Sequence, residues 1–419
     1  MEATRSTARV LALAIVSTGC SSSPTTALGM TADASIAVDA RAPADAALTI
    51  DAGAPIVAGG SADAGSSSAD AGPSADAGTS SQLAFVATYL GGLLVFAVDP
   101  DSGALVEAPG SPYDPRGTLY AQSLDPTGQF LYAVDINANT IIGFRTTPAS
   151  AALTPLPHFP VITGSGPVAI AIDPMARFVY VATSGPDASL FVYTRNRTDG
   201  TLVRSAGSPH RLGSEANSVA PDPSGRFVYL QSVSGIHAYA VDGVSGDLTE
   251  IDHSPFTATL GGALAFHPGG TLLFNGGRGL NVLAVDADSG ALRPVEGSPF
   301  TSDVGSDPTA TVIALDPKGK FVYAVDTFTG HLSGFAIDVD TVKLTPVPDS
   351  PFDAKPSPYS VAVDPTGRFV YVGNDDADEI SAFAINPANG SLTPVPHSPF
   401  PAIGLQPEIT FSKPVAPGN

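Results

Sequence analysis

The 419-residue chain contains a single cysteine, no tryptophan and only three methionines. One cysteine excludes a disulfide within the chain and any zinc site built from several cysteines. Basic residues are also scarce: 19 Lys and Arg stand against 40 Asp and Glu, which gives a net charge of -21. Because such a charge repels phosphate backbones, nucleic acid is not an expected partner.

The sequence leaves little room for long helices. Its 43 Gly and 39 Pro are residues that interrupt regular backbone, and together they make up about a fifth of the chain. The 43% of hydrophobic residues is nevertheless enough for a large core. We therefore expect a folded, helix-poor protein and not a globally disordered one.

The first twenty residues have the pattern of an export signal. Arg5 and Arg9 precede an apolar run over residues 10–16 that is too short to span a bilayer as a helix. The run ends in Ser-Thr-Gly-Cys, which resembles the bacterial lipoprotein cleavage box, with Ser17 where that box usually has leucine. We expect residues 1–20 to be a signal peptide and Cys20 to be lipidated, with plain secretion as the alternative. The protein would then be held at the cell envelope by its lipid alone, at the outer membrane or cell surface rather than the inner membrane.

Residues 21–81 have a different composition, dominated by Ala, Asp, Ser and Gly. The pentapeptide SADAG occurs at residues 61–65 and again at 74–78. Such a stretch has no apolar residues in a pattern that could form a core, and its acidic charges repel one another. It is predicted to be a disordered tether, followed by a folded domain over residues 82–413 and a tail over 414–419.

The folded part is a repeat. An Asp-Pro pair opens a phrase that recurs about every 48 residues, at Asp125, Asp173, Asp222, Asp316 and Asp364, with His267 in the Asp position of one copy. A second phrase, of the type Ser-Pro-Phe, marks the end of each unit, at residues 111–113, 158–160, 208–210, 254–256, 298–300, 350–352 and 398–400. Seven such ends imply seven units.

Each unit has the pattern of a four-stranded antiparallel sheet. In the last unit, short apolar strands are predicted at 360–363, 369–373 and 380–385, and a fourth begins at Leu392, with Pro- and Gly-containing turns between them. The first unit begins at residues 83–87, which align with a second strand, so it lacks an inner strand. Residues 407–411 align with an inner strand that has no unit after it. The sequence therefore predicts an all-β, seven-bladed propeller whose ring is closed by a C-terminal strand.

The repeated phrase Asp-Pro-x-Gly-Arg-Phe-Val-Tyr-Val, clearest at residues 364–372, resembles the seven-bladed propellers of the lactonase family, which includes 6-phosphogluconolactonase-like and YVTN-repeat proteins. The resemblance implies opening of a sugar lactone by His, Arg and acidic side chains where the inner strands enter the central channel. In this chain that position, five residues before each Asp-Pro pair, is occupied by Tyr120, Val168, Asn217, Gly262, Thr311, Tyr359 and, by alignment, Glu408. None of these seven positions holds His or Arg. The position that follows each of them does not hold His or Arg either.

Two functions remain open. The first is a binding module for a small polar ligand or an envelope protein, without a cofactor, whose mouth presents Tyr120, Asn217, Thr311, Tyr359 and Glu408. The alternative is a lactone hydrolase that uses charges from loops at the same mouth. The available loop residues are Arg116, His210, Arg211, Glu215, Arg278, His331 and Lys355, and the weak catalytic candidates are Arg211, His331 and Glu408.

Other polar motifs are interpreted as structural. The acidic stretches at 99–103 and 286–290 fall where each unit must turn, and they lack the downstream Glu of a calcium loop. The acidic run at 374–379 is expected to be a solvated loop, with a cation site near Glu408 as the alternative. Four histidines lie in the repeated phrases and are expected to be structural: His158, His253, His267 and His397.

Overall fold

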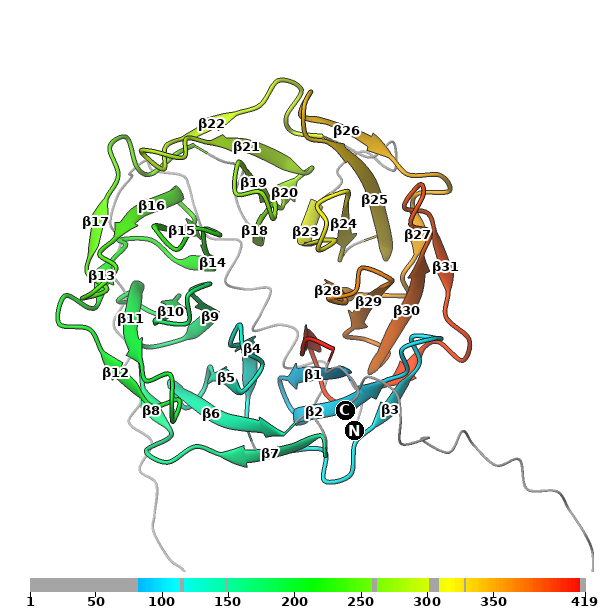
Figure 1. Cartoon of the computed structure of the whole chain (residues 1–419), viewed down its shortest axis with the longest axis horizontal. Helices are drawn as coiled ribbons and strands as arrows, with labels where there is room; N and C mark the ends of the chain where they lie inside the picture. The colour runs from blue at the N-terminus through cyan, green and yellow to red at the C-terminus, as the bar shows by residue number, and fades with distance from the viewer. Residues whose placement is uncertain are drawn as a thin grey trace, which may run out of the picture. The chain divides into compact units, whose positions relative to one another are not determined.

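The computed structural model describes residues 82–113, 117–147, 150–257, 262–300, 309–327 and 329–414. These residues form seven antiparallel β-sheets, the blades of a propeller, around a common axis (Figure 1). Within these ranges there is no helix that could cross a membrane. The predicted signal peptide, Cys20 and the tether lie outside the described residues.

The first blade is built from the two ends of the described chain. It contains β1 (Gln82–Thr88), β2 (Gly92–Val98) and β3 (Leu105–Glu107). The C-terminal strand β33 (Glu408–Phe411) pairs antiparallel with β1 and is the innermost strand of this blade. The predicted closure of the ring by a C-terminal strand is confirmed.

The other six blades follow in chain order, each running from an inner to an outer strand. Blades two and three consist of β4 (Leu119–Leu124), β5 (Phe130–Asp135), β6 (Thr140–Thr147) and β7 (Ala152–Pro155), then β9 (Pro167–Ile172), β10 (Phe178–Thr183), β11 (Ser189–Arg195) and β12 (Leu202–Arg204). Blades four and five consist of β14 (Ala216–Pro221), β15 (Phe227–Ser232), β16 (Gly235–Val241) and β17 (Leu248–Glu250), then β18 (Leu264–Phe266), β19 (Leu272–Asn275), β21 (Asn281–Val285) and β22 (Leu292–Pro294). Blades six and seven consist of β23 (Thr309–Leu315), β24 (Phe321–Asp326), β25 (His331–Asp338) and β26 (Lys343–Pro346), then β28 (Pro358–Val363), β29 (Phe369–Asn374), β30 (Glu379–Ile385) and β31 (Leu392–Pro394).

The Ser-Pro-Phe phrases add short pairings that the sequence did not predict. Four of them form two-residue strands that return to the third strand of their own blade, namely β8 (Val161–Ile162), β13 (His210–Arg211), β27 (Phe352–Asp353) and β32 (Phe400–Pro401). A further strand, β20 (Gly277–Arg278), pairs with β23 of blade six. The serine hydroxyl of the phrase accepts a hydrogen bond from a third-strand N–H, as at Ser398, whose Oγ lies 2.8 Å from the Ala382 nitrogen. The phrase therefore holds the outer edge of the blades in which it begins with serine.

The Asp-Pro phrase builds the turn between the first and second strands. The carboxylate of Asp364 accepts hydrogen bonds from the backbone N–H groups of Thr366 (3.0 Å), Arg368 (2.8 Å) and Phe369 (2.8 Å). Side-chain capping of this kind is the reason that Asp favours turns. His267 takes over the same task in blade five, because its Nδ1 accepts the Gly269 N–H at 3.0 Å. The structural interpretation of His267 is confirmed.

The same phrase also joins neighbouring blades. The Tyr371 hydroxyl of blade seven donates a hydrogen bond to the carbonyl of Gly103 in blade one, at 2.8 Å. Gly103 has a φ of +76°, and a Cβ there would lie 2.5 Å from the Phe369 ring, so both its conformation and its contact require glycine. Equivalent bonds join Tyr132 to Gly200, Tyr229 to Gly290 and Tyr323 to Gly390.

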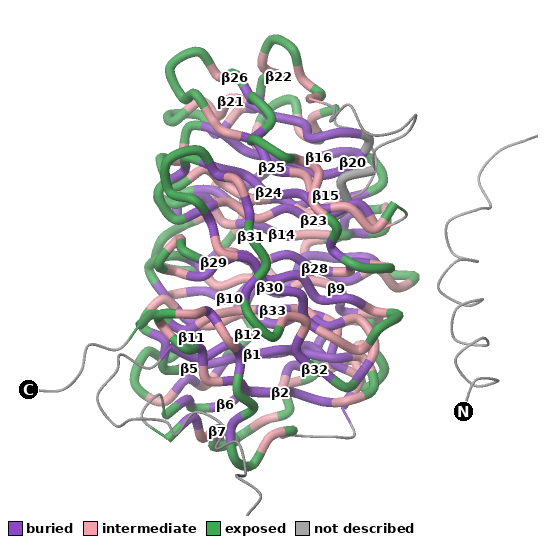
Figure 2. The backbone as a smooth tube through the Cα atoms, turned by 90° about the vertical axis from the view of Figure 1, so that its right-hand side faces the viewer, coloured by how far each residue is buried: buried purple, intermediate pink, exposed green. Residues whose placement is uncertain are grey.

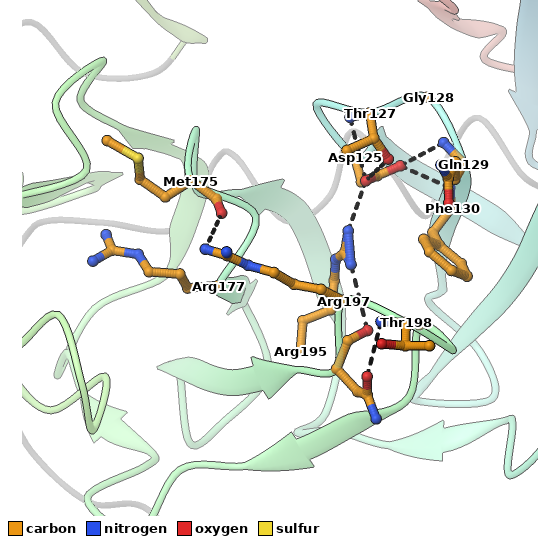
Figure 3. A network of polar contacts seen from close by, with 12 residues as sticks. Asp125, Thr127, Gly128, Gln129, Phe130, Met175, Arg177, Arg195, Arg197 and Thr198 are labelled. Carbon is orange, nitrogen blue, oxygen red and sulfur yellow. Dashed lines mark hydrogen bonds and ion pairs between the residues drawn. The ribbon is translucent and has the colours of Figure 1, made fainter.

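A buried ion pair joins blades two and three (Figure 3). Nη2 of Arg195 lies 2.6 Å from Oδ2 of Asp125, and both side chains are almost completely shielded from water. Burial alone would raise the pKa of Asp125, but hydrogen bonds from Thr127 and Phe130, together with Arg195, outweigh burial and lower it. This pair is therefore a buried structural contact that links two neighbouring blades.

The hydrophobic core is divided among the interfaces between blades. Seven clusters of buried apolar residues each combine residues of two adjacent sheets, and one of them joins blades seven and one. Figure 2 shows the buried residues along the strands and the exposed ones in the connecting loops. Because blades one and seven share such a cluster, the ring is closed by packing as well as by strand pairing.

Candidate functional site

The ring of positions predicted at the mouth coincides with a β-bulge in the inner strands. The register between first and second strands shifts around one residue in blades two, three, four, six and seven. In each of these blades one inner-strand residue has no register partner on the second strand. These residues are Tyr120, Val168, Asn217, Thr311 and Tyr359. A bulge redirects a side chain out of the alternation of the strand and is common beside binding sites. The sequence identified the position but not the bulge.

Three of the predicted site residues lie together. The rings of Tyr120 on β4 and Tyr359 on β28 meet edge to face, with centroids 6.4 Å apart and an interplanar angle of 87°. Glu408 is the first residue of β33, which packs against both β4 and β28. In Figure 1, β4 and β28 flank the first blade at the axis. The structure thus places two aromatic rings and one carboxyl group on one arc of the ring.

The Glu408 carboxyl group has an unusual environment. Its Oε2 is buried and has no hydrogen-bond partner among the described residues. Burial raises the pKa of this carboxyl from its ordinary value of 4.5 to about 8. At pH 7 the neutral form therefore exceeds the ionised form by roughly tenfold. A neutral carboxyl can donate a hydrogen bond as well as accept one.

The phenol of Tyr359 is also held in its neutral form. Burial raises the pKa of Tyr359 well above its ordinary value, and the proximity of Tyr120 and a hydrogen bond with it raise that pKa further. Glu408 and Asp375 act on Tyr359 in the same direction. The phenol of Tyr359 is therefore a hydrogen-bond donor over the whole physiological pH range.

Buried polar residues fix the closing strand behind these side chains. Nε2 of Gln122 donates to the carbonyl oxygens of Phe85 at 2.7 Å and of Glu408 at 2.8 Å, so a single amide spans blades two and one. On the other side, the Ser360 hydroxyl donates to the carbonyl of Pro407 at 2.5 Å. These contacts set the position of Glu408 relative to the two tyrosines. Gln122 could not be identified from the sequence, because nothing in the repeat marks a contact between residues 286 positions apart.

The other predicted site residues lie elsewhere. Asn217 is exposed on β14 of blade four, and the side chain of Thr311 lies outside the described part, as do Arg116 and the side chain of Arg278. Arg211 lies on β13, at the third strand of blade three, and forms an exposed ion pair with Asp187 at 3.1 Å. His331 begins β25 in blade six, opposite Asp326 and Asp353. Figure 1 shows β13 and β25 on opposite sides of the axis. The structure does not bring Arg211, His331 and Glu408 together.

The remaining loop candidates and the acidic loops form no common cluster either. His210 lies on β13 with Arg211, whereas Glu215 and Lys355 are exposed loop residues in blades four and six. The Asp99 carboxylate accepts hydrogen bonds from the N–H and the hydroxyl of Ser102, both at 2.7 Å, as a turn requires. Among the residues that the structure describes, no three His, Cys, Asp or Glu side chains gather as metal ligands would.

Comparison with known proteins agrees with this architecture. Residues 64–300 and 264–402 match the family described as lactonase, 7-bladed β-propeller, and the chain belongs to this family. No curated protein sequence is significantly similar to the chain.

Solved structures of similar fold cover about the same part of the chain. The periplasmic gluconolactonase of Pseudomonas aeruginosa has a TM-score of 0.68 at 19% identity, over 80% of this chain and all of that one. A Bacteroides fragilis protein whose description suggests a 6-phosphogluconolactonase has a TM-score of 0.66 at 18% identity, over 80% of this chain and 98% of that one. A Lactobacillus plantarum protein has a TM-score of 0.66 at 20% identity, again over 80% and 100% of the two chains. At these identities the likeness establishes the fold alone.

Proposed function

We propose that the chain is a binding module for a small, neutral, polyhydroxylated ligand such as a sugar lactone, held by Tyr120, Tyr359 and Glu408. One observation carries the proposal: a buried carboxyl oxygen without a hydrogen-bond partner lies on the strand between two tyrosines that meet edge to face. Aromatic rings provide apolar faces for a sugar ring, and a neutral carboxyl can both donate to and accept from hydroxyl groups.

The protonation of Glu408 separates this ligand class from its main alternative, an organic cation. A ligand that uses the neutral carboxyl binds well below pH 8 and loses affinity as the pH rises through that value, whereas a cation gains affinity over the same interval. Titration with a neutral hexose lactone and with choline, each at pH 6.5 and 9, tests the assignment. Stronger binding of choline at pH 9, with no lactone binding at either pH, would contradict it.

Lactone hydrolysis is a second candidate, favoured by the family and by the pKa of about 8 for Glu408. The ionised fraction of Glu408 would take a proton from a water molecule while the water oxygen bonds to the lactone carbonyl carbon. The phenol of Tyr359 would stabilise the oxyanion, and the ring C–O bond would then break as the alcohol oxygen receives a proton. Among the described residues, no contact brings a cationic side chain to Glu408. Because such a cation would stabilise the oxyanion, binding without turnover is the preferred function.

A pH-stat assay with glucono-1,5-lactone decides between binding alone and hydrolysis. A rate above the spontaneous one in wild type that is lost in Glu408→Gln would establish the hydrolase. A rate equal to the spontaneous one, together with saturable binding, would establish the binding module. Asn217→Ala is the matched control, because Asn217 occupies the same bulge position in a distant blade.

We also infer that the protein is exported and held at the cell envelope through Cys20. The sequence pattern of residues 1–20 supports the inference, and one protein of similar fold is named as periplasmic. Cys20→Ser is expected to move the protein from the membrane fraction to the soluble periplasmic or secreted fraction. An unchanged membrane fraction would contradict lipidation.

A further inference from the structure

A second constellation of polar side chains lies in blade four, away from the axial site. The hydroxyl oxygen of Ser234, in the turn between β15 and β16, lies 2.9 Å from Nε2 of His237 on β16. Nδ1 of the same imidazole lies 3.5 Å from Oε1 of Glu250, the last residue of β17. A hydroxyl, an imidazole and a carboxylate in this order form the arrangement by which hydrolases activate a serine nucleophile.

The surrounding hydrogen bonds determine the direction of proton donation. The Ser232 hydroxyl donates to the Gly235 carbonyl at 3.1 Å, so its proton is not available to Ser234. With the proton of His237 on Nδ1, facing Glu250, Nε2 is free to accept the Ser234 hydroxyl proton. The Ser214 hydroxyl donates to the Ser232 oxygen at 3.1 Å, so its single proton is not available to Ser234 either. The Ser234 oxygen lies 2.9 Å from the Ser214 oxygen, the Ser232 oxygen and Nε2 of His237. An unprotonated imidazole nitrogen is the most basic of these three acceptors, so the Ser234 proton is directed at His237.

The solvent exposure of Ser234 and His237 suits a nucleophile and its base. Ser234 is exposed, whereas His237 is only 7% exposed. The imidazole stacks on the ring of Tyr239, with centroids 6.4 Å apart and an angle of 8°, and this contact fixes its orientation. The Ser254 hydroxyl donates to Oε1 of Glu250 at 2.8 Å and steadies the carboxylate. The nucleophile is therefore accessible while the base is shielded and held.

We propose that Ser234 is an activated nucleophile that accepts acyl groups from small esters. Its oxygen forms a bond to the ester carbonyl carbon while His237 takes its proton, and the alcohol leaves with that proton as the C–O bond breaks. Water then attacks the acyl-serine, again with His237 as base, and the acid is released. The complete reaction consumes only the ester and one water molecule. Glu250 is a positioning residue, because it acts through His237.

This site is independent of the binding function proposed for the axis. β16 lies in blade four and Glu408 in blade one, and Figure 1 shows the two blades on different sides of the ring. An experiment that contradicts one of the two proposals therefore leaves the other untouched.

The test is covalent labelling with an alkyl fluorophosphonate, whose fluoride is displaced by a serine oxygen as the serine proton passes to the base. Full-length protein is incubated with the probe, and the modified residue is located by peptide mass spectrometry. We expect labelling at Ser234 in wild type, none in Ser234→Ala, and a rate about 100-fold lower in His237→Gln. Glu250→Gln, at a half-exposed position that folding tolerates, is expected to slow labelling about tenfold.

Two controls distinguish activation from mere exposure. His210→Gln changes the imidazole that packs on Tyr239 at 6.1 Å without touching Ser234, and is expected to label like wild type. Glu107→Gln, at an exposed position on β3 in blade one, should also label normally. Absence of label on Ser234 in wild type would overturn the proposal, as would equal rates in wild type, His237→Gln and Glu250→Gln.

Discussion

Replacing Glu408 by Gln should change how the stability of the propeller depends on pH. In the native state the carboxyl keeps its proton up to about pH 8, while in the unfolded chain it loses the proton near 4.5. Between these values the native state binds more protons than the unfolded state, so the free energy of unfolding falls as the pH rises. The glutamine side chain does not titrate in this range, so Glu408→Gln should lack this dependence of the unfolding free energy on pH.

The size of the effect follows from the shift. One pH unit within the window corresponds to about 1.4 kcal/mol per proton, so wild type should lose up to about 2.7 kcal/mol relative to Glu408→Gln between pH 5.5 and 7.5. For a domain of this size that difference is roughly 4 °C in melting temperature. Structural relaxation and water penetration around the carboxyl make these values upper limits.

Thermal unfolding followed by far-ultraviolet circular dichroism at several pH values measures the difference. Glu107→Gln, at an exposed position on β3, is the matched control and should run parallel to wild type, within about 0.5 kcal/mol. Parallel curves for wild type and Glu408→Gln would refute the argument, because they would mean that Glu408 has the same pKa in the folded and unfolded states.

Three further outcomes follow from the same structure. Truncation after residue 404 removes β33 and should cause aggregation or a large fall in melting temperature, whereas deletion of residues 21–80 should change melting little; equal melting of the truncated and full chains would contradict ring closure. Asp125→Ala leaves Arg195 buried without its partner and should cost about 3–5 kcal/mol in urea unfolding, and a cost below about 1 kcal/mol would show that water reaches the pair. Tyr359→Ala should weaken lactone binding at least tenfold with a native circular dichroism spectrum, and loss of the folded spectrum would show that the ring is a packing element instead.

The architecture was predictable from sequence because the phrases that repeat are those that fold each blade and join it to the next. Asp364 builds a turn and Tyr371 bonds across the interface, and both have counterparts in most other blades. The closing strand was predictable because an inner strand was missing at one end of the array and present in excess at the other.

The candidate site was predictable only in part. Tyr120 and Tyr359 occupy equivalent repeat positions in blades that flank the first one, so their proximity followed from ring closure. The Gln122 amide, which spans blades two and one, leaves no mark in the repeat. Likewise, Ser234, His237 and Glu250 meet because a tight turn and an outer strand place them side by side, without a local motif.

We propose that Tyr120, Tyr359 and Glu408 form one ligand site at the axis. Calorimetric titration of wild type, Tyr359→Ala and Asn217→Ala with freshly dissolved glucono-1,5-lactone at pH 6.5 tests it most directly. We predict saturable binding to wild type and to Asn217→Ala, and binding at least tenfold weaker to Tyr359→Ala. Equal affinity in all three proteins, or no binding to wild type, would contradict the account.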